Sequence, residues 1–207
     1  MGPGSHVLTF PVNHGQTMNV VAFHTTDNTW KDTQKLVAPA TREDAFRDFQ
    51  DFGPAVHKII QMARPELDVW AIFDLAMNPV PTMVRERVCL IGDAAHATSP
   101  HHGAGAGMCI EDAAVMTALL ADDRVNTLDD VSRAFEVFNR ERKDRGQWLV
   151  QQSRHIGDCY EWQAMNVGRD FAKIEEEINR GNSIIADVDV EELCRNARSR
   201  LNEVASL

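Results

Sequence analysis

The sequence has no long apolar run and no surplus of basic residues. No stretch approaches the roughly 18 apolar residues that a membrane-spanning helix needs, and the first residues lack the charged-then-apolar pattern of a secretion signal. The formal net charge of −10 at pH 7 would repel phosphate backbones and anionic lipid, which attract Lys and Arg side chains. We therefore expect neither nucleic acid nor a membrane as a partner.

Cysteine is sparse and dispersed. The chain has 4 cysteines in 207 residues. They lie far apart and form no Cys-x-x-Cys pair: Cys89, Cys109, Cys159 and Cys194. This usage is typical of reduced, intracellular proteins, so we expect a cytoplasmic location. Internal repeats and low-complexity tracts are also lacking, and a content of 43% apolar residues is ordinary for a globular chain that buries a core.

The N-terminal third combines strand and short-helix patterns. Residues 7–12 and 18–23 are β-rich and are joined by a turn in which Gly15 can adopt a positive φ, which predicts a hairpin. A capping-box pattern begins at Thr41 and predicts a short helix, and Gly53-Pro54 precedes a second one. Residues 67–74 have the composition of a further strand.

Helices dominate the rest of the chain. Residues 88–91 are apolar on both faces, which predicts a short strand covered on both sides, as in parallel sheets. Helical patterns follow at 108–121, after a capping box at Thr127–Asp130, at 161–180 and at 189–205, where the stripe ends at Val204. The fold class is therefore α+β (mixed α/β), with part of an antiparallel sheet, one buried strand leading into a helix, and a helical C-terminal region.

The stretch 87–113 carries the clearest chemical signal. Three alternate glycines, Gly103, Gly105 and Gly107, enter a helix, where bare backbone amides and the positive end of the helix dipole favour an anion. Asp93 follows the short strand and is placed to accept hydrogen bonds from sugar or polyol hydroxyls. The spacing is not the Rossmann fingerprint, because Gly-x-Gly-x-x-Gly from Gly103 would require glycine at Met108.

This stretch, RVCLIGDAAHATSPHHGAGAGMCIEDA, resembles the Gly-Asp motif of the class A FAD-dependent aromatic hydroxylases, the para-hydroxybenzoate and salicylate hydroxylase family. Residues 100–107 are most similar to salicylate hydroxylase-like members, and residues 2–12 and 67–74 resemble strands of the family's substrate domain. The resemblance covers about residues 1–155. It implies a substrate-domain part at 1–84, the C-terminal part of the FAD-binding domain at 85–155, and a helical extension at 156–207.

The resemblance also implies cofactors and roles. FAD would be the cofactor, NADH or NADPH the reductant, and O2 and a small aromatic acid such as salicylate the substrates. The side chain of Asp93 would bind the ribityl hydroxyls of FAD, and the flavin ring would face the backbone of the loop. The implied cofactor-binding residues are Gly92, Asp93, Gly103, Ala104, Gly105, Ala106 and Gly107, and the implied residues beside the substrate are Pro100, His101 and His102.

The sequence departs from the family pattern in two ways. Many members have Gln where Ala104 stands and Asn where Gly107 stands, which weakens the side-chain part of the role but not the part that backbone amides play. Residues 1–86 also contain no Gly-x-Gly-x-x-Gly unit for the FAD pyrophosphate. We therefore expect the chain to be the C-terminal portion of a monooxygenase. The alternative is a truncated, catalytically silent structural or interaction module without flavin, prone to self-association through an apolar surface.

Other polar residues of this stretch admit two interpretations each. We expect His96 to be a packing and hydrogen-bonding group rather than a chemical one. We expect Glu111 and Asp112 to complement the dipole of the helix and to cap it rather than to form a catalytic pair. His101 and His102 remain open between substrate-facing and structural roles. A metal site is disfavoured, because adjacent histidines on an extended loop point opposite ways.

Overall fold

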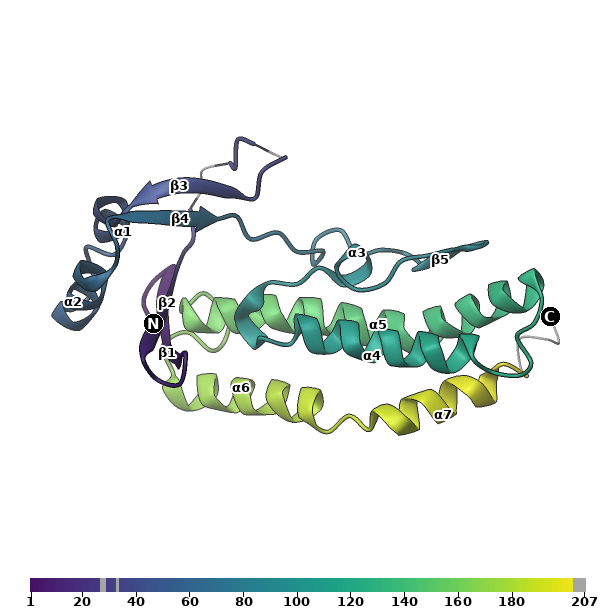
Figure 1. Cartoon of the computed structure of the whole chain (residues 1–207). Coiled ribbons are helices and arrows are strands. Elements are labelled where there is room, and N and C mark those ends of the chain that lie inside the picture. Colours follow the sequence, from purple (N-terminus) through teal and green to yellow (C-terminus); the bar gives the residue numbers. More distant parts are fainter. Residues whose placement is uncertain (27–28, 33, 203–207) are drawn as a thin grey trace. The chain divides into compact units, whose positions relative to one another are not determined.

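The computed structural model describes residues 1–26, 29–32 and 34–202 and combines antiparallel strand pairs with helices. The chain divides into two compact units. The first unit consists of Met1–Ile72 and Gly157–Ile174, and the second consists of Phe73–Ile156 and Glu175–Leu207. Figure 1 shows the order of the elements along the chain. In the part of the chain that the structure describes, no helix is both long enough and apolar enough to cross a membrane.

The first unit opens with the expected hairpin. Strand β1 (Ser5–Val12) pairs antiparallel with β2 (Thr17–His24). The register runs from Ser5 opposite His24 to Val12 opposite Thr17. Gly15 has a φ of 81° in the turn, so the prediction of a positive φ at this glycine is confirmed.

A second pair of strands in this unit is connected by two short helices. Strand β3 (Val37–Thr41) pairs antiparallel with β4 (Glu66–Trp70), and α1 (Arg42–Asp48) and α2 (Pro54–Met62) lie between them in sequence. The amide of Asp44 donates to the hydroxyl of Thr41 at 3.1 Å, and the amide of Thr41 donates to the carboxylate of Asp44 at 2.9 Å. The predicted capping box is therefore present.

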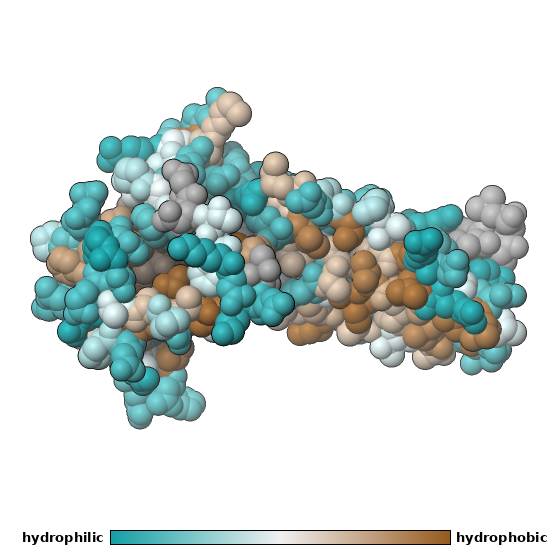
Figure 2. All heavy atoms as spheres, turned by 90° about the horizontal axis from the view of Figure 1, so that it is seen from above, coloured by the Kyte–Doolittle hydropathy of each residue, from teal (hydrophilic) through white to brown (hydrophobic). Residues whose placement is uncertain are grey.

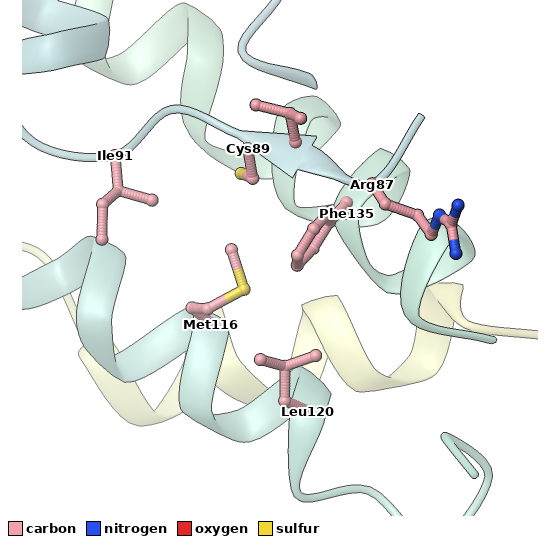
Figure 3. Close-up of a pocket in the computed structure, with 7 residues that line it drawn as sticks. Arg87, Cys89, Ile91, Met116, Leu120 and Phe135 are labelled. Carbon is pink, nitrogen blue, oxygen red and sulfur yellow. The ribbon is translucent and has the colours of Figure 1, made fainter. Parts of the chain in front are cut away.

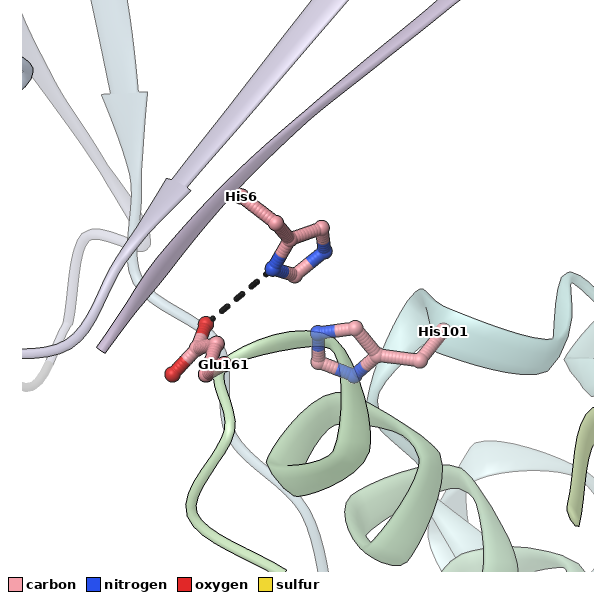
Figure 4. Close-up of side chains that lie close together, drawn as sticks. All are labelled: His6, His101 and Glu161. Carbon is pink, nitrogen blue, oxygen red and sulfur yellow. Dashed lines mark hydrogen bonds and ion pairs between the residues drawn. The ribbon is translucent and has the colours of Figure 1, made fainter. Parts of the chain in front are cut away.

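A buried polar cluster joins the hairpin to the returning segment of the first unit. The carboxylate of Glu161 lies 3.2 Å from Nδ1 of His6 (Figure 4) and accepts a hydrogen bond of 2.6 Å from the Thr25 hydroxyl. The His6 ring stacks on Phe23 with the ring centres 4.4 Å apart. These contacts hold Glu161 against the hairpin, although it lies 155 residues after His6 in the sequence.

The second unit contains a small hairpin and most of the helices. Strand β5 (Val84–Arg85) pairs with β6 (Val88–Cys89) and is followed by α3 (Asp93–His96) and a 3₁₀ turn (Pro100–His102). The helices that follow are α4 (Gly105–Leu120), α5 (Leu128–Tyr160), α6 (Phe171–Ala186) and α7 (Val190–Arg200). Both α5 and α6 continue across a boundary between the two units.

The predicted helix start at Thr127 is confirmed. The Thr127 amide donates to the carboxylate of Asp130 at 2.8 Å, and the Asp130 amide donates to the Thr127 hydroxyl at 3.2 Å. The reciprocal pair satisfies amides at the start of α5 that have no partner within the helix.

The core of the second unit lies among β5, α3, α4, α5 and α7. Its members are apolar and buried: Met83, Val84, Ala95, Val115, Leu119, Ala134, Val137, Phe138, Ala197 and Leu201. Helix α7 packs on α4, and Nε of Arg198 donates to the carbonyl of Ala118 at 3.1 Å. The C-terminal helix is therefore part of this core.

The strand predicted at 88–91 differs from expectation. Strand β6 contains only Val88 and Cys89 and pairs antiparallel with β5. Cys89 and Leu90 pack against the core, but Val88 is 65% exposed and Ile91 is 47% exposed. Burial on both faces is therefore wrong for this chain, because among the described residues only one face of the strand has a packing partner.

Other element boundaries also differ from expectation. The strand expected at 67–74 ends at Trp70, and the helix expected from 161 begins at Phe171. Positive φ angles at Trp162, Asn166 and Gly168 bend the chain before α6 and prevent an earlier helical start. The expectation for Val204 lies outside the described residues.

Candidate functional site

The site begins at a sharp turn after β6. Gly92 is buried and has φ 59° and ψ −142°, a backbone conformation that is essentially restricted to glycine. A Cβ at this position would also lie 3.1 Å from Sγ of Cys109 on α4. The next residue, Asp93, is exposed at the first position of α3. The turn therefore places an exposed carboxylate where the chain passes close to α4.

The start of α4 is open. Gly103 has a φ of 63° and ends the 3₁₀ turn, and α4 then begins without a side-chain cap among the described residues. A Cβ added at Gly103 or Gly107 would meet no atom within 4 Å among the described residues. Amides in the first turn of a helix have no partner within the helix and carry a partial positive charge. This surface can bind an anionic or hydrogen-bond-accepting ligand.

The two histidines of the 3₁₀ turn have different surroundings. Nδ1 of His101 lies 2.9 Å from the Ser99 hydroxyl, and both rings are partly buried. The ring of His102 packs against α6, where a Cβ at Gly181 would lie 2.5 Å from Cε1 of His102. Gly181 thus leaves room for this ring, and α6 fixes its place.

The pKa of His102 is lowered from its ordinary value of 6.5. Burial is the main cause, the charge of His155 adds to it, and a hydrogen bond with Asn182 acts in the opposite direction. His102 is therefore favoured in its neutral form near pH 7. The partner residues on α6 lie about eighty positions further along the chain, and no local pattern in the sequence links them to His102.

A buried ionic network lies beneath the turn and the second turn of α4. Asp112 is 1% exposed and accepts three hydrogen bonds. Its Oδ2 receives the Gly92 amide at 3.0 Å and Nε2 of His96 at 2.7 Å, and its Oδ1 receives Nε of Arg142 at 2.8 Å. The carboxylate therefore connects α4 to the turn, to α3 and to α5.

Glu111 extends the network toward α5 alone. Its carboxylate lies 2.8 Å from Nη1 of Arg142 and accepts bonds of 2.7 and 2.8 Å from Nε and Nη2 of Arg145. Arg142 is completely buried, and its Nη2 also donates to the carbonyl of Met108 at 3.4 Å. Two carboxylates and two guanidinium groups thus balance in charge, as burial requires.

These positions correct one expectation and confirm another. Glu111 and Asp112 do not cap α4, because the helix begins at Gly105 and the pair lies in its second turn, facing arginines of α5. His96 is 2% exposed, hydrogen-bonds Asp112, and packs where a Cβ at Gly146 would lie 2.8 Å from its Cδ2. It is a packing and hydrogen-bonding group, as expected.

The network lowers the pKa of both acids. For Asp112, burial raises the pKa, but hydrogen bonds from His96, Gly92 and Arg142 outweigh burial, and the net pKa lies below the ordinary 3.8. For Glu111, burial is again outweighed, here by Arg145 and Arg142, and the net pKa lies below 4.5. Both side chains are therefore ionised at neutral pH.

An apolar groove lies beside β6. It has a volume of about 440 Å³ and is lined by side chains of β6, α4 and α5, several of which Figure 3 labels: Arg87, Val88, Cys89, Ile91, Met116, Leu120 and Phe135. Figure 2 shows hydrophobic side chains gathered on this part of the surface of the second unit. Val88, Ile91 and Leu120 are all more than 40% exposed. This apolar surface is one that soluble proteins normally cover.

Comparison with known proteins identifies the family. The family model for the FAD binding domain matches residues 8–153, so the chain belongs to the FAD binding domain family. The chain is 43% identical over 205 residues to an FAD-dependent monooxygenase of Aspergillus niger, a match that covers 94% of this chain and 46% of the relative. It is 36% identical over 178 residues to a salicylate hydroxylase of Sarocladium schorii, covering 78% of this chain and 37% of the relative.

The fold agrees with this assignment. A solved salicylate hydroxylase in complex with its substrate superposes with a TM-score of 0.85 at 35% identity, over 94% of this chain and 47% of that protein. The mixed α and β class and the resemblance to the aromatic hydroxylases are therefore confirmed. The chain spans about half the length of the curated relatives it matches.

Proposed function

We propose that the chain is the C-terminal portion of an FAD-dependent, NADH- or NADPH-using monooxygenase that hydroxylates a small aromatic acid of the salicylate type. One observation carries the proposal: the exposed carboxylate of Asp93 follows a turn in which Gly92 lies against Cys109 of α4, and this helix has an uncapped, glycine-rich start. Both features suit a bound flavin, because a carboxylate can accept hydrogen bonds from its ribityl hydroxyls and bare amides stabilise negative charge on its ring.

The residues present fit FAD. Asp93 would accept hydrogen bonds from the ribityl hydroxyls, and Gly92 would let the chain turn toward them. The backbone of Gly103, Ala104, Gly105, Ala106 and Gly107 would face the pyrimidine edge of the ring, where fixed amide dipoles stabilise negative charge without reorganising. When bound, FAD supplies the chemistry of reduction by NADH or NADPH and of oxygen transfer from O2 to the substrate.

The substrate would lie beside the 3₁₀ turn. Pro100 is exposed there, and His101 and His102 follow it. A neutral His102, consistent with its lowered pKa, can donate or accept one hydrogen bond to a phenol or carboxylate. The His102 ring packs against Gly181 of α6, which supports a defined orientation for this ring. The similarity to salicylate hydroxylases supports an aromatic acid as the substrate class.

A second candidate function has its own support. The exposed apolar groove beside β6 favours a module that binds another polypeptide or a copy of itself without flavin. In this alternative the Gly92 turn keeps its shape but binds no cofactor.

A flavin titration of the purified chain separates the two candidates. Quenching of FAD fluorescence that saturates at one flavin per chain, with NADH or NADPH oxidation stimulated by salicylate, supports the monooxygenase portion. Unquenched FAD at micromolar protein, together with self-association in sedimentation, supports the module.

A further inference from the structure

Asp112 makes the only side-chain contact to the Gly92 amide that is seen within the described ranges. Glycine adopts this conformation without steric cost, but it can also adopt many others, so the shape of the turn is fixed only by what its surroundings hold. The bond comes from a side chain that is itself fixed from two other directions, by His96 and by Arg142. The three groups lie on α4, α3 and α5, so the shape of the turn depends on how these helices pack.

We infer that Asp112 is a positioning residue for flavin binding, which acts through the Gly92 amide and holds the Asp93 carboxylate in its exposed place. This inference rests on the proposed function, and it assigns a buried residue that does not touch the cofactor. Arg142 and His96 act on the same turn by fixing the two oxygens of the Asp112 carboxylate.

The charge on Asp112 is required by the number of donors around it. Three donors, the Gly92 amide, the His96 ring and the Arg142 guanidinium, point at its two oxygens. Asparagine has the same size but one acceptor oxygen and an NH2 group, so at least one donor would face a donor. Because the site is buried, water does not relieve that conflict. The bond from the Gly92 amide is the longest of the three and, unlike that from Arg142, comes from an uncharged donor, so we expect it to be the first to be lost.

The chain offers a matched control at the adjacent position. Glu111 is also a buried acid with a lowered pKa, and it pairs with the same Arg142, but its remaining contacts lead to Arg145 and not to the turn. Glu111→Gln removes the same unit of charge and the same kind of hydrogen bond as Asp112→Asn. A difference between the two variants therefore reports on the turn rather than on the network in general.

The first measurement needs no flavin. Native-state amide hydrogen exchange is compared in wild type, Asp112→Asn and Glu111→Gln, after correction for global stability from urea unfolding. We expect the Gly92 amide and its neighbours up to His96 to exchange about tenfold faster in Asp112→Asn and less than about twofold faster in Glu111→Gln. Nitrogen NMR of His96 adds a second signal, because Nε2 carries the proton in wild type and the Asp112→Asn variant relieves that requirement.

The second measurement is FAD affinity by fluorescence quenching. Asp112→Asn is expected to weaken binding about tenfold, while Glu111→Gln weakens it less than about twofold. Asp93→Ala is expected to weaken FAD binding less in the Asp112→Asn variant than in the wild type, because both substitutions act through the position of the Asp93 carboxylate. Equal effects of Asp112→Asn and Glu111→Gln on exchange, or full additivity with Asp93→Ala, would overturn the inference.

The two measurements distinguish a failure of the proposed function from a failure of the inference about Asp112. If the wild-type chain binds no FAD, the proposed function fails for this chain, and hydrogen exchange alone still decides whether Asp112 holds the turn. If FAD binds but Asp112→Asn changes neither exchange nor affinity, the inference fails and the proposed function stands. Should Asp112→Asn fail to fold, Arg142→Lys serves in its place, because it keeps the charge but loses the Nε bond to Oδ1.

Discussion

The first two turns of α4 differ in whether their polar groups have hydrogen-bond partners within the described residues. The first turn is exposed at Ala106 and Gly107 and has no side-chain cap within the described residues. The second turn, at Glu111 and Asp112, is buried, and its carboxylates are fully engaged by donors from three other segments. The amides of the first turn can therefore bind a ligand. The carboxylates of Glu111 and Asp112 are hydrogen-bonded to neighbouring segments and hold the backbone of those segments in a fixed shape.

The largest expected effect concerns the buried ionic network at the second turn of α4. Arg142→Met leaves the carboxylates of Glu111 and Asp112 without their shared partner in a buried place. We expect the free energy of unfolding in urea to fall by about 3–5 kcal/mol, the usual cost of leaving a buried charge unpaired. Arg195→Met, which removes the exposed ion pairs with Asp189 and Glu191, is the control and is expected to cost less than about 1 kcal/mol. Equal losses would remove the network from its structural role.

The next effect is on the turn itself. Gly92→Ala forces a side chain into a conformation restricted to glycine and toward Sγ of Cys109, so the free energy of unfolding is expected to fall by about 2–4 kcal/mol. Gly15→Ala is the control, because Gly15 also has a positive φ but a Cβ there meets nothing within 4 Å of the described atoms. Its cost is expected to be about 1 kcal/mol. Thermal unfolding of both variants gives the difference, and a larger loss at Gly15 would contradict the account.

The acid dependence of stability is expected to be smaller but specific. The folded pKa values of Asp112 and Glu111 are lowered, so their stabilisation is complete above the ordinary values of 3.8 and 4.5. It is lost as the pH falls through the lower folded values, when the native carboxylates take up protons. Asp112→Asn and Glu111→Gln should each flatten the dependence of the unfolding free energy on pH below about 4.5. An unchanged slope would show that neither acid is ionised in the native network.

The last effect is on the reactivity of Cys89, on the apolar side of the turn, and leaves the free energy of unfolding unchanged. Burial, with the charge of Asp112, raises the pKa of Cys89 to about 11. At pH 8 its thiolate is therefore expected to be about a hundredfold scarcer than that of a thiol at the ordinary value of 9.0, and alkylation by iodoacetamide correspondingly slow. Mass spectrometry of the labelled peptide measures the rate. Fast labelling of Cys89 at pH 8 would contradict its packing against the core.

Local sequence signals predicted local structure well. Capping boxes at Thr41 and Thr127 and the glycine turn at Gly15 each depend on residues within a few positions of one another, and each was confirmed. The Gly-Asp turn and the glycines that enter α4 were visible for the same reason. A pattern confined to one segment is therefore a sufficient basis for the shape of that segment.

Features that depend on distant partners were missed. Asp112 and Arg142 are 30 residues apart, and nothing in either segment marks the other, so the pair at 111–112 was taken for a helix cap. The packing of His102 on Gly181 was equally invisible. The prediction that residues 88–91 are buried on both faces was wrong. An apolar strand pattern shows that both faces can be buried, but it does not show whether the described residues include a layer that covers each face.

The most direct test of the central claim compares Asp93 with its surroundings by calorimetric titration with FAD. Asp93 is exposed, so Asp93→Ala should leave thermal unfolding unchanged while weakening FAD binding by about 1–3 kcal/mol, the cost of hydroxyl groups left without their acceptor. Asp123→Ala, another exposed acid of the second unit, should change neither. Equal FAD affinity of the wild type and Asp93→Ala would contradict the claim that this turn binds the flavin.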